Sequence, residues 1–173
     1  NPERRPRVHL MVNDGNGYFN SGLSLMANED YHRIHTYKDV FLADLNNDGL
    51  DDILTGSGGG GPLLNETIDD GILLLMSDAE TGQYSDQTNL INFPRITRDR
   101  GEFTEEVLAL AGVDLFVAAD INNDGWKDLV TMAVAGGERG AFPLVLLNQE
   151  GAGFVPWDRF SNDDDPIKPN QWT

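Results

Sequence analysis

The chain has 173 residues, the size of a single domain that buries about 70% of its unfolded surface. Its net charge of −17 and its pI of about 4.2 disfavour nucleic acid and anionic membranes as partners. The sequence contains no cysteine, and no apolar run approaches the roughly eighteen residues that would cross a bilayer. Because the first residue is Asn1 rather than Met, we expect a processed chain or an excised fragment.

The first predicted element is half of a strand unit. An apolar run at residues 8–12 is followed by a Gly-rich turn at 13–17 and by Tyr18 and Phe19. This order predicts two strands joined by a tight turn.

Two longer units repeat this ending and precede it with two further strands. Their apolar runs are short and lie between Gly and Asp clusters, which is typical of strands. The runs lie at residues 40–43, 53–55 and 72–76, followed by Tyr84, and at residues 113–119, 129–134 and 144–147, followed by Phe154. We therefore expect ten strands in one domain, 1–173, which contains the half unit at 8–19, whole units at 40–86 and 113–157, and an irregular acidic tail at 158–173.

The first two strands of each whole unit are joined by nearly identical nine-residue loops, 44–52 and 120–128. Each loop has oxygen-bearing side chains at positions 1, 3, 5 and 9 and a glycine at position 6. These side chains are Asp44, Asn46, Asp48 and Asp52 in the first loop and Asp120, Asn122, Asp124 and Asp128 in the second. Calcium takes six to eight oxygen ligands, which such a loop supplies together with the position-7 carbonyl and water. The spacing therefore predicts two calcium ions, one per loop.

The loops allow two other interpretations. An EF-hand begins in the same way, but it needs a Glu at position 12 and flanking helices, and position 12 is Thr55 or Thr131. A solvated Asn/Asp/Gly turn also favours these residues. Two matched copies in matched strand contexts favour calcium over the solvated turn.

This order of strands and loops resembles the FG-GAP/VCBS-type repeat family, the blades of calcium-binding β-propellers such as integrin α-subunit heads. The resemblance implies an all-β fold of antiparallel four-stranded blades, about two and a half units, in a partial or open propeller. It places calcium ligands on the eight loop side chains and on the carbonyls of Leu50 and Trp126. The repeat is longer than the roughly 40–50 residues of ordinary blades, so the units carry insertions.

The longest insertion, residues 91–112, predicts a short helix. Phe103, Val107 and Leu110 recur at helical spacing, and acidic residues lie early in the segment. Just before them, three arginines are expected to pair with the acidic surface. These are Arg95, Arg98 and Arg100.

The Gly-rich segments, the histidines and the aromatic residues are expected to be mainly structural. Gly-rich segments 56–62 and 136–140 are expected to be flexible surface loops and second-rank ligand candidates, and His32 and His35 are expected in a surface loop. Six aromatic residues are expected to pack in the core or between blades: Phe19, Phe41, Phe116, Trp126, Phe154 and Trp157.

The favoured function is a calcium-binding extracellular repeat module for adhesion, scaffolding or protein–protein interaction, with calcium structural rather than catalytic. No catalytic residue is predicted, because the best-placed carboxylates are assigned to calcium. The alternatives are a carbohydrate-binding module and part of a polysaccharide lyase. Extracellular, cell-surface or periplasmic placement is expected, because extracellular modules bind calcium at about 10⁻⁴–10⁻³ M. The expected partner is an unidentified protein or glycan, and open blade edges allow self-association.

Overall fold

The computed structural model describes residues 11–21, 39–56, 72–93, 95–99, 104–108, 116–134 and 141–157. This part of the chain is all-β, with a single 3-10 turn, η4 (Thr88–Leu90). Within it, no helix is long and apolar enough to cross a membrane. The strands are β1 (Met11–Asn13), β2 (Phe19–Ser21), β3 (Asp39–Ala43), β4 (Asp52–Gly56), β5 (Ile72–Asp78), β6 (Gln83–Asp86), β7 (Arg95–Asp99), β8 (Thr104–Leu108), β9 (Phe116–Ala119), β10 (Asp128–Val134), β11 (Ala141–Asn148) and β12 (Phe154–Pro156).

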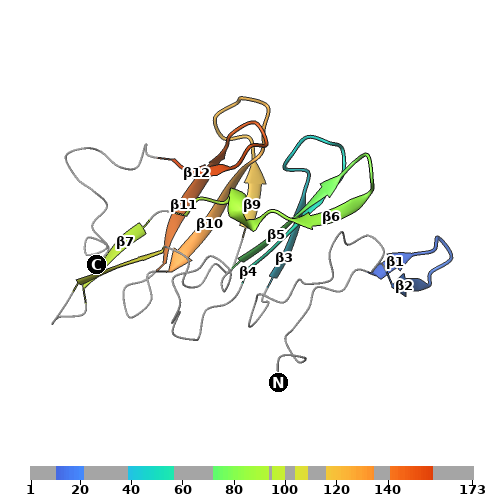
Figure 1. Ribbon diagram of the computed structural model, residues 1–173, viewed down its shortest axis with the longest axis horizontal. Helices are drawn as coiled ribbons and strands as arrows, with labels where there is room; N and C mark the ends of the chain where they lie inside the picture. Colours follow the sequence, from blue (N-terminus) through green and yellow to red (C-terminus); the bar gives the residue numbers. More distant parts are fainter. Residues whose placement is uncertain are drawn as a thin grey trace, which may run out of the picture.

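Two four-stranded antiparallel sheets make up most of the described structure (Figure 1). Their strand orders are β3-β4-β5-β6 and β9-β10-β11-β12, so each sheet follows the sequence order as a meander. The two predicted four-stranded units are thereby confirmed. The described strands form separate sheets and do not close into a ring.

The two sheets have equivalent registers where the predicted calcium loops leave them. Ala43 pairs with Asp52 at the end of β3 and β4, and Ala119 pairs with Asp128 at the end of β9 and β10. Each nine-residue loop therefore starts directly after a paired strand residue, and its final Asp is itself paired in the sheet.

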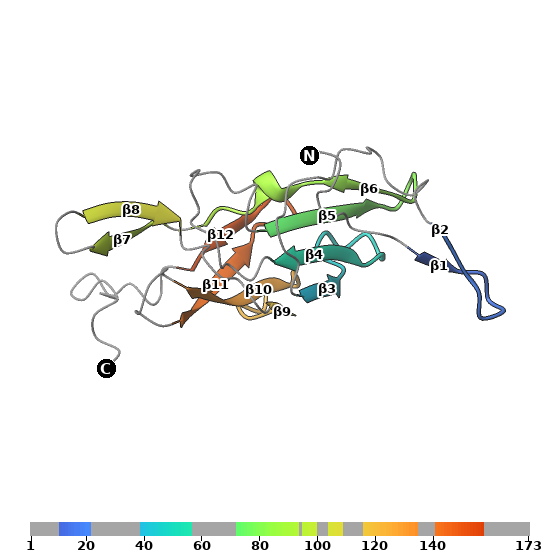
Figure 2. The ribbon, with the colours of Figure 1, turned by 90° about the horizontal axis from the view of Figure 1, so that it is seen from below.

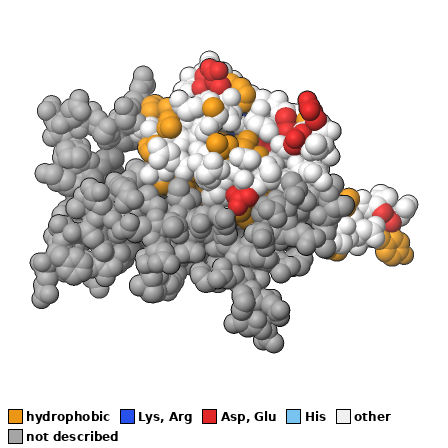
Figure 3. Space-filling model, in the orientation of Figure 1, with side chains coloured by type: hydrophobic (Ala, Val, Ile, Leu, Met, Phe, Trp, Pro, Cys, Tyr) orange, Lys and Arg blue, Asp and Glu red, His pale blue; other side chains and the backbone are white. Residues whose placement is uncertain are grey.

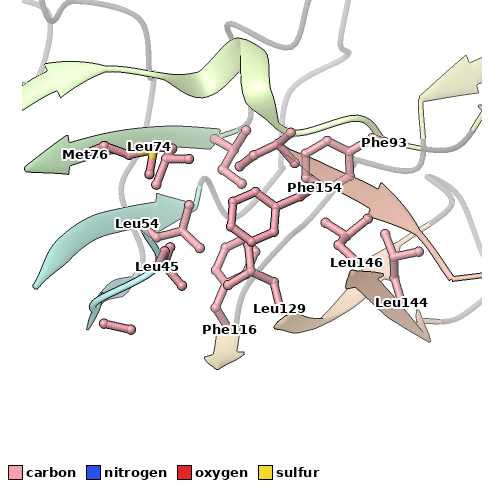
Figure 4. Close-up of a cluster of buried hydrophobic side chains, with 13 residues drawn as sticks. Leu45, Leu54, Leu74, Met76, Phe93, Phe116, Leu129, Leu144, Leu146 and Phe154 are labelled. Carbon is pink, nitrogen blue, oxygen red and sulfur yellow. The ribbon is translucent and has the colours of Figure 1, made fainter. Parts of the chain in front are cut away.

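The hydrophobic core lies between the facing sides of the two sheets (Figure 4). The alternation of side chains along each strand sends every second apolar residue to this side. The cluster contains Ala43, Leu45, Leu54, Ile72, Leu74, Met76, Ile91, Phe93, Phe116, Leu129, Leu144, Leu146 and Phe154. Leu45 belongs to the first Asp loop, so this loop is anchored in the shared core.

The segment after β6 crosses to the second sheet. Following η4, Ile91 forms a parallel bridge to Phe154, and the Asn92 backbone N–H donates to the Phe154 carbonyl at 2.8 Å. Ile91 and Phe93 are buried in the core cluster. The linking chain therefore joins the two sheets as well as connecting them in sequence (Figure 2).

The helix predicted in the insertion is wrong, because β7 and β8 form a two-stranded antiparallel hairpin there. Ile96 pairs with Val107, and Arg98 pairs with Glu105. Three apolar residues at helical spacing are a weak signal, whereas the β-branched Thr104 and Val107 favour strand. The described residues hold twelve strands rather than the expected ten, and this hairpin accounts for both additional strands.

The N-terminal half unit is present as the hairpin β1–β2. Its strand residues are exposed, with Phe19 at 60% relative exposure, and the neighbouring Tyr18 is at 73%. The expectation that Phe19 packs in the core is therefore wrong. His32, His35, Arg100, the segments 57–62 and 136–140 and the tail 158–173 lie outside the described residues.

Candidate metal-binding loops

Both Asp loops have the same backbone conformation. The residue at position 4 is left-handed in each, with φ of 57° at Asn47 and 62° at Asn123. Position 6 has φ of 89° at Gly49 and 92° at Gly125, values that favour glycine. The matched sequences therefore fold into matched turns.

In the first loop, the side-chain oxygens at positions 1, 3 and 5 accept hydrogen bonds from the loop's own amides. Asp44 accepts from the N–H groups of Asp48 at 3.2 Å and Gly49 at 3.1 Å. Asn46 Oδ1 accepts from the Asp48 N–H at 3.0 Å, and Asp48 Oδ1 accepts from the Leu50 N–H at 2.8 Å. These bonds hold the loop closed around positions 5 to 7.

The second loop repeats this network bond for bond. Asp120 accepts from the N–H groups of Asp124 at 3.0 Å and Gly125 at 2.9 Å. Asn122 Oδ1 accepts from the Asp124 N–H at 3.0 Å, and Asp124 Oδ1 accepts from the Trp126 N–H at 2.9 Å. The second loop is the more exposed of the two, with its positions 1, 3 and 5 all at the surface.

The position-9 carboxylates lie beneath the loops and are buried. Asp52, at 0% exposure, accepts from the Leu45 N–H at 2.7 Å and from the Ser77 N–H at 2.8 Å. The Ser77 hydroxyl also donates to it at 2.9 Å. Burial raises the pKa of Asp52 above its ordinary value. The hydrogen bonds from Ser77 and Leu45 lower this pKa more weakly, and the nearby Asp48 charge raises it slightly further. A positive ion beside Asp52 would relieve the cost of burying its charge.

Asp128 occupies the same place in the second unit and is also at 0% exposure. It accepts from the Ile121 N–H at 2.9 Å and from the Asn148 N–H at 2.8 Å. In both units the position-9 carboxylate therefore ties position 2 of the loop to the end of the third strand. Ser77 and Asn148 are the partners that sequence reasoning missed, because pairing across the sheet brings them to the position-9 carboxylates from 25 and 20 residues away.

The donor set suits a hard cation. A carboxylate offers about four lone-pair sites, and in the second loop each oxygen of Asp120, Asp124 and Asp128 accepts one hydrogen bond within the described residues. In the stretches 39–56, 72–93, 116–134 and 141–157, which form the two four-stranded sheets and their loops, the basic residue is Lys127, and the other charged groups are acidic. Oxygen ligands with surplus negative charge are what calcium prefers.

The acidic side chains alone do not form a metal cluster. Among the described residues, no group of three or more His, Cys, Asp or Glu side chains is gathered closely enough to hold a metal ion. The predicted set in each loop also draws on an Asn oxygen and a backbone carbonyl. Leu50, at 41% exposure, and the half-buried Trp126 occupy the position whose carbonyl was predicted as a ligand.

The two loops lie at the same end of the two sheets and touch one another (Figure 1). Acidic side chains gather at this end of the surface (Figure 3). Asn47 Nδ2 donates to the Gly125 carbonyl at 3.2 Å. Close by, a Cβ added at Gly151 would lie 3.1 Å from the Trp126 ring and 3.8 Å from the Asn46 Cα. The structure thus brings together two candidate sites that the sequence treats separately.

No family model, curated protein or solved structure matches the chain.

Proposed function

We propose that the chain is a calcium-binding repeat module in which two calcium ions stabilise a scaffold for adhesion or protein interaction. The first ion is held by Asp44, Asn46, Asp48, Asp52 and the Leu50 carbonyl. The second is held by Asp120, Asn122, Asp124, Asp128 and the Trp126 carbonyl. In the same proposal the two four-stranded sheets are FG-GAP/VCBS-like blades of a partial or open propeller.

One observation carries the proposal: a buried position-9 carboxylate lies beneath an identical turn in both units. A solvated turn needs the side-chain oxygens at positions 1, 3 and 5, which cap its own amides. It does not need Asp52 and Asp128. Both carboxylates are fully buried, and neither accepts a hydrogen bond from the amides of positions 5 to 7. Burying a carboxylate is costly unless it is paired or bound to a metal, and a cation above it offsets that cost.

Electrostatics also favours an ion that stabilises the fold. Two carboxylates about 4 Å apart repel by roughly 4 kcal/mol at an effective dielectric near 20. Bringing three of them closer than the described structure holds them, around one point of a loop, would therefore require a compensating charge. Calcium supplies it, and the loops then present the ends of both sheets in a fixed arrangement.

The proposed module works outside the cytosol, where the calcium concentration is high enough to fill sites of this kind. Extracellular modules fill their calcium sites at about 10⁻⁴–10⁻³ M, above cytosolic concentrations. The proposed partner is a protein or a glycan, and the open sheet edges allow self-association as a second mode of contact.

Isothermal titration calorimetry with calcium tests the proposal. The wild-type protein should bind two ions, and Asp48→Ala and Asp124→Ala should each bind one. Asp78→Ala is the matched control, because Asp78 caps the amides of Glu80 and Thr81 in an exposed turn outside both loops. A wild-type stoichiometry of zero, or variants that bind like the wild type, would refute the assignment.

A further inference from the structure

We infer that the two Asp loops are a coupled pair, such that calcium bound in one loop raises the affinity of the other. This inference rests on the proposed function and adds to it a regulatory property of the same sites. It is carried by a set of hydrogen bonds that join the loops to each other.

The first link is direct. Asn47, at position 4 of the first loop, donates from Nδ2 to the carbonyl of Gly125, at position 6 of the second loop. Gly125 lies between Asp124 and Trp126, which carry the ligands at positions 5 and 7. A change in the backbone path of the second loop therefore moves the Gly125 carbonyl, which accepts the hydrogen bond from Asn47 of the first loop.

The second link is buried and passes through Asn148, at 1% exposure. Its backbone N–H donates to Asp128, and its Nδ2 donates to the Leu45 carbonyl at 2.8 Å and the Lys127 carbonyl at 3.0 Å. The Leu45 N–H in turn donates to Asp52. The two position-9 carboxylates are thus connected through Asn148 and the backbone of Leu45.

The equivalent residue of the first unit makes no such link. Ser77 donates to Asp52 and Asp48, and its carbonyl accepts from Asn46 Nδ2 at 3.1 Å, all within its own unit. Ser77 and Asn148 therefore form a natural pair for comparison, one local and one bridging. Asn47 and Asn123 form a second pair, because both are left-handed at position 4 and Asn47 bonds across the loops.

The sign of the coupling follows from two opposing effects. A filled loop carries less negative charge, so it attracts the second cation less strongly, but this effect is screened over about 8 Å at physiological ionic strength. The bridging hydrogen bonds through Asn148 are buried or part-buried and are screened much less, whereas the Asn47 bond is exposed. An ion that fixes Asp128 or the turn at Gly125 also fixes the donors and acceptors of the first loop, so the second ion has less ordering to accomplish.

The test is calorimetric titration with calcium at about 0.15 M salt, combined with a comparison of first-loop affinity in the presence and absence of a working second loop. Disabling the second loop with Asp124→Ala, or with the milder Asp124→Asn, should weaken calcium binding at the first loop by about fivefold or more, the lower end of ordinary coupling. Reciprocity requires Asp48→Ala to weaken the second loop by the same factor. Hydrogen exchange of the Gly49 and Gly125 amides assigns each binding event to its loop.

The double variant Asn47→Gly/Asn148→Ser keeps every proposed ligand and removes both links, with glycine accepting the left-handed position. It should bind two ions, and disabling its second loop should change first-loop affinity by less than about twofold, which is close to independence. The matched control Asn123→Gly/Ser77→Ala should keep the full coupling.

The outcomes separate the two proposals. Absence of calcium binding in the wild type overturns the proposed function and the coupling with it. Two ions that bind independently, or with the second weaker, overturn the coupling and leave the proposed function standing. Coupling that survives in Asn47→Gly/Asn148→Ser overturns the assignment to these contacts, whereas its loss there and retention in the control support it.

Discussion

Asp128→Asn is the sharpest probe of the buried carboxylate beneath the second loop. Asp128 is fully buried and accepts the Ile121 N–H through one oxygen and the Asn148 N–H through the other. Asparagine has the same shape but only one acceptor oxygen, so its NH₂ group must face one of these two donors. The substitution therefore opposes two donors at a buried position without creating a cavity.

The magnitude follows from the number of bonds lost. One backbone N–H loses its acceptor, and an unsatisfied buried donor costs about 1–3 kcal/mol. The remaining bond changes from charged to neutral, which weakens it further. In a chain of this size each 1 kcal/mol lowers Tm by about 2–4 °C, so a decrease of about 2–12 °C is expected.

The assay is thermal and urea unfolding in calcium-free buffer, which separates this effect from ion binding. Asp124→Asn is the matched control, because Asp124 is exposed and an Asn there still caps the Trp126 N–H; its effect should stay within about 0.5 kcal/mol. Hydrogen exchange at the Ile121 and Asn148 amides should accelerate only in Asp128→Asn. Equal stabilities for the two variants would refute the bridging role of Asp128.

Three further predictions follow from the same structure. Calcium at ten times its dissociation constant should stabilise the fold by about 1.4 kcal/mol per site, so Tm rises with calcium and falls with EDTA, and a melting curve unchanged by EDTA would count against structural calcium. Phe154→Ala should cost about 3–5 kcal/mol by opening a cavity between the sheets, whereas Phe19→Ala on the exposed hairpin should cost little in urea unfolding; similar losses would contradict the assigned core. Burial holds the pKa of Asp52 above 3.8. Between pH 3.8 and the raised pKa, the native state therefore keeps a proton that the unfolded chain has released. The metal-free protein should lose stability as the pH rises through this range. Comparison with Asp52→Asn across that range should isolate this slope, and parallel pH profiles would show that Asp52 does not cause it.

The sheets were accessible from the sequence because short apolar runs alternate with strong turn signals. The run at 72–76 and the turn that follows it gave β5 and β6, and the same logic gave β11 and β12. The Asp loops fixed the hairpins β3–β4 and β9–β10, since a loop that closes on itself must return the chain beside the strand it left. Local chemistry therefore determined both the strands and their order.

Long-range pairing determined what the sequence did not reveal. The hairpin β7–β8 was mistaken for a helix because spacing alone does not say whether Val107 finds a strand partner, and Ile96 provides one. Ser77 and Asn148 show no motif, and they reach the loops only because β5 and β11 end beside β4 and β10. The exposure of Phe19 depends likewise on what packs against β1–β2, which the local pattern does not encode.

The Asp loops show why a motif and a site are different claims. The oxygens of Asp44, Asn46 and Asp48 close the turn on its own amides, so a turn that binds nothing would select the same residues. Position 9 distinguishes the two cases, because its carboxylate bonds to position 2 and not to the amides of positions 5 to 7, and it is costly to bury. Converting the position-9 Asp to Asn in either loop should therefore abolish one calcium site and leave the turn formed. A motif that only closes a turn would not produce this loss of calcium without loss of the turn.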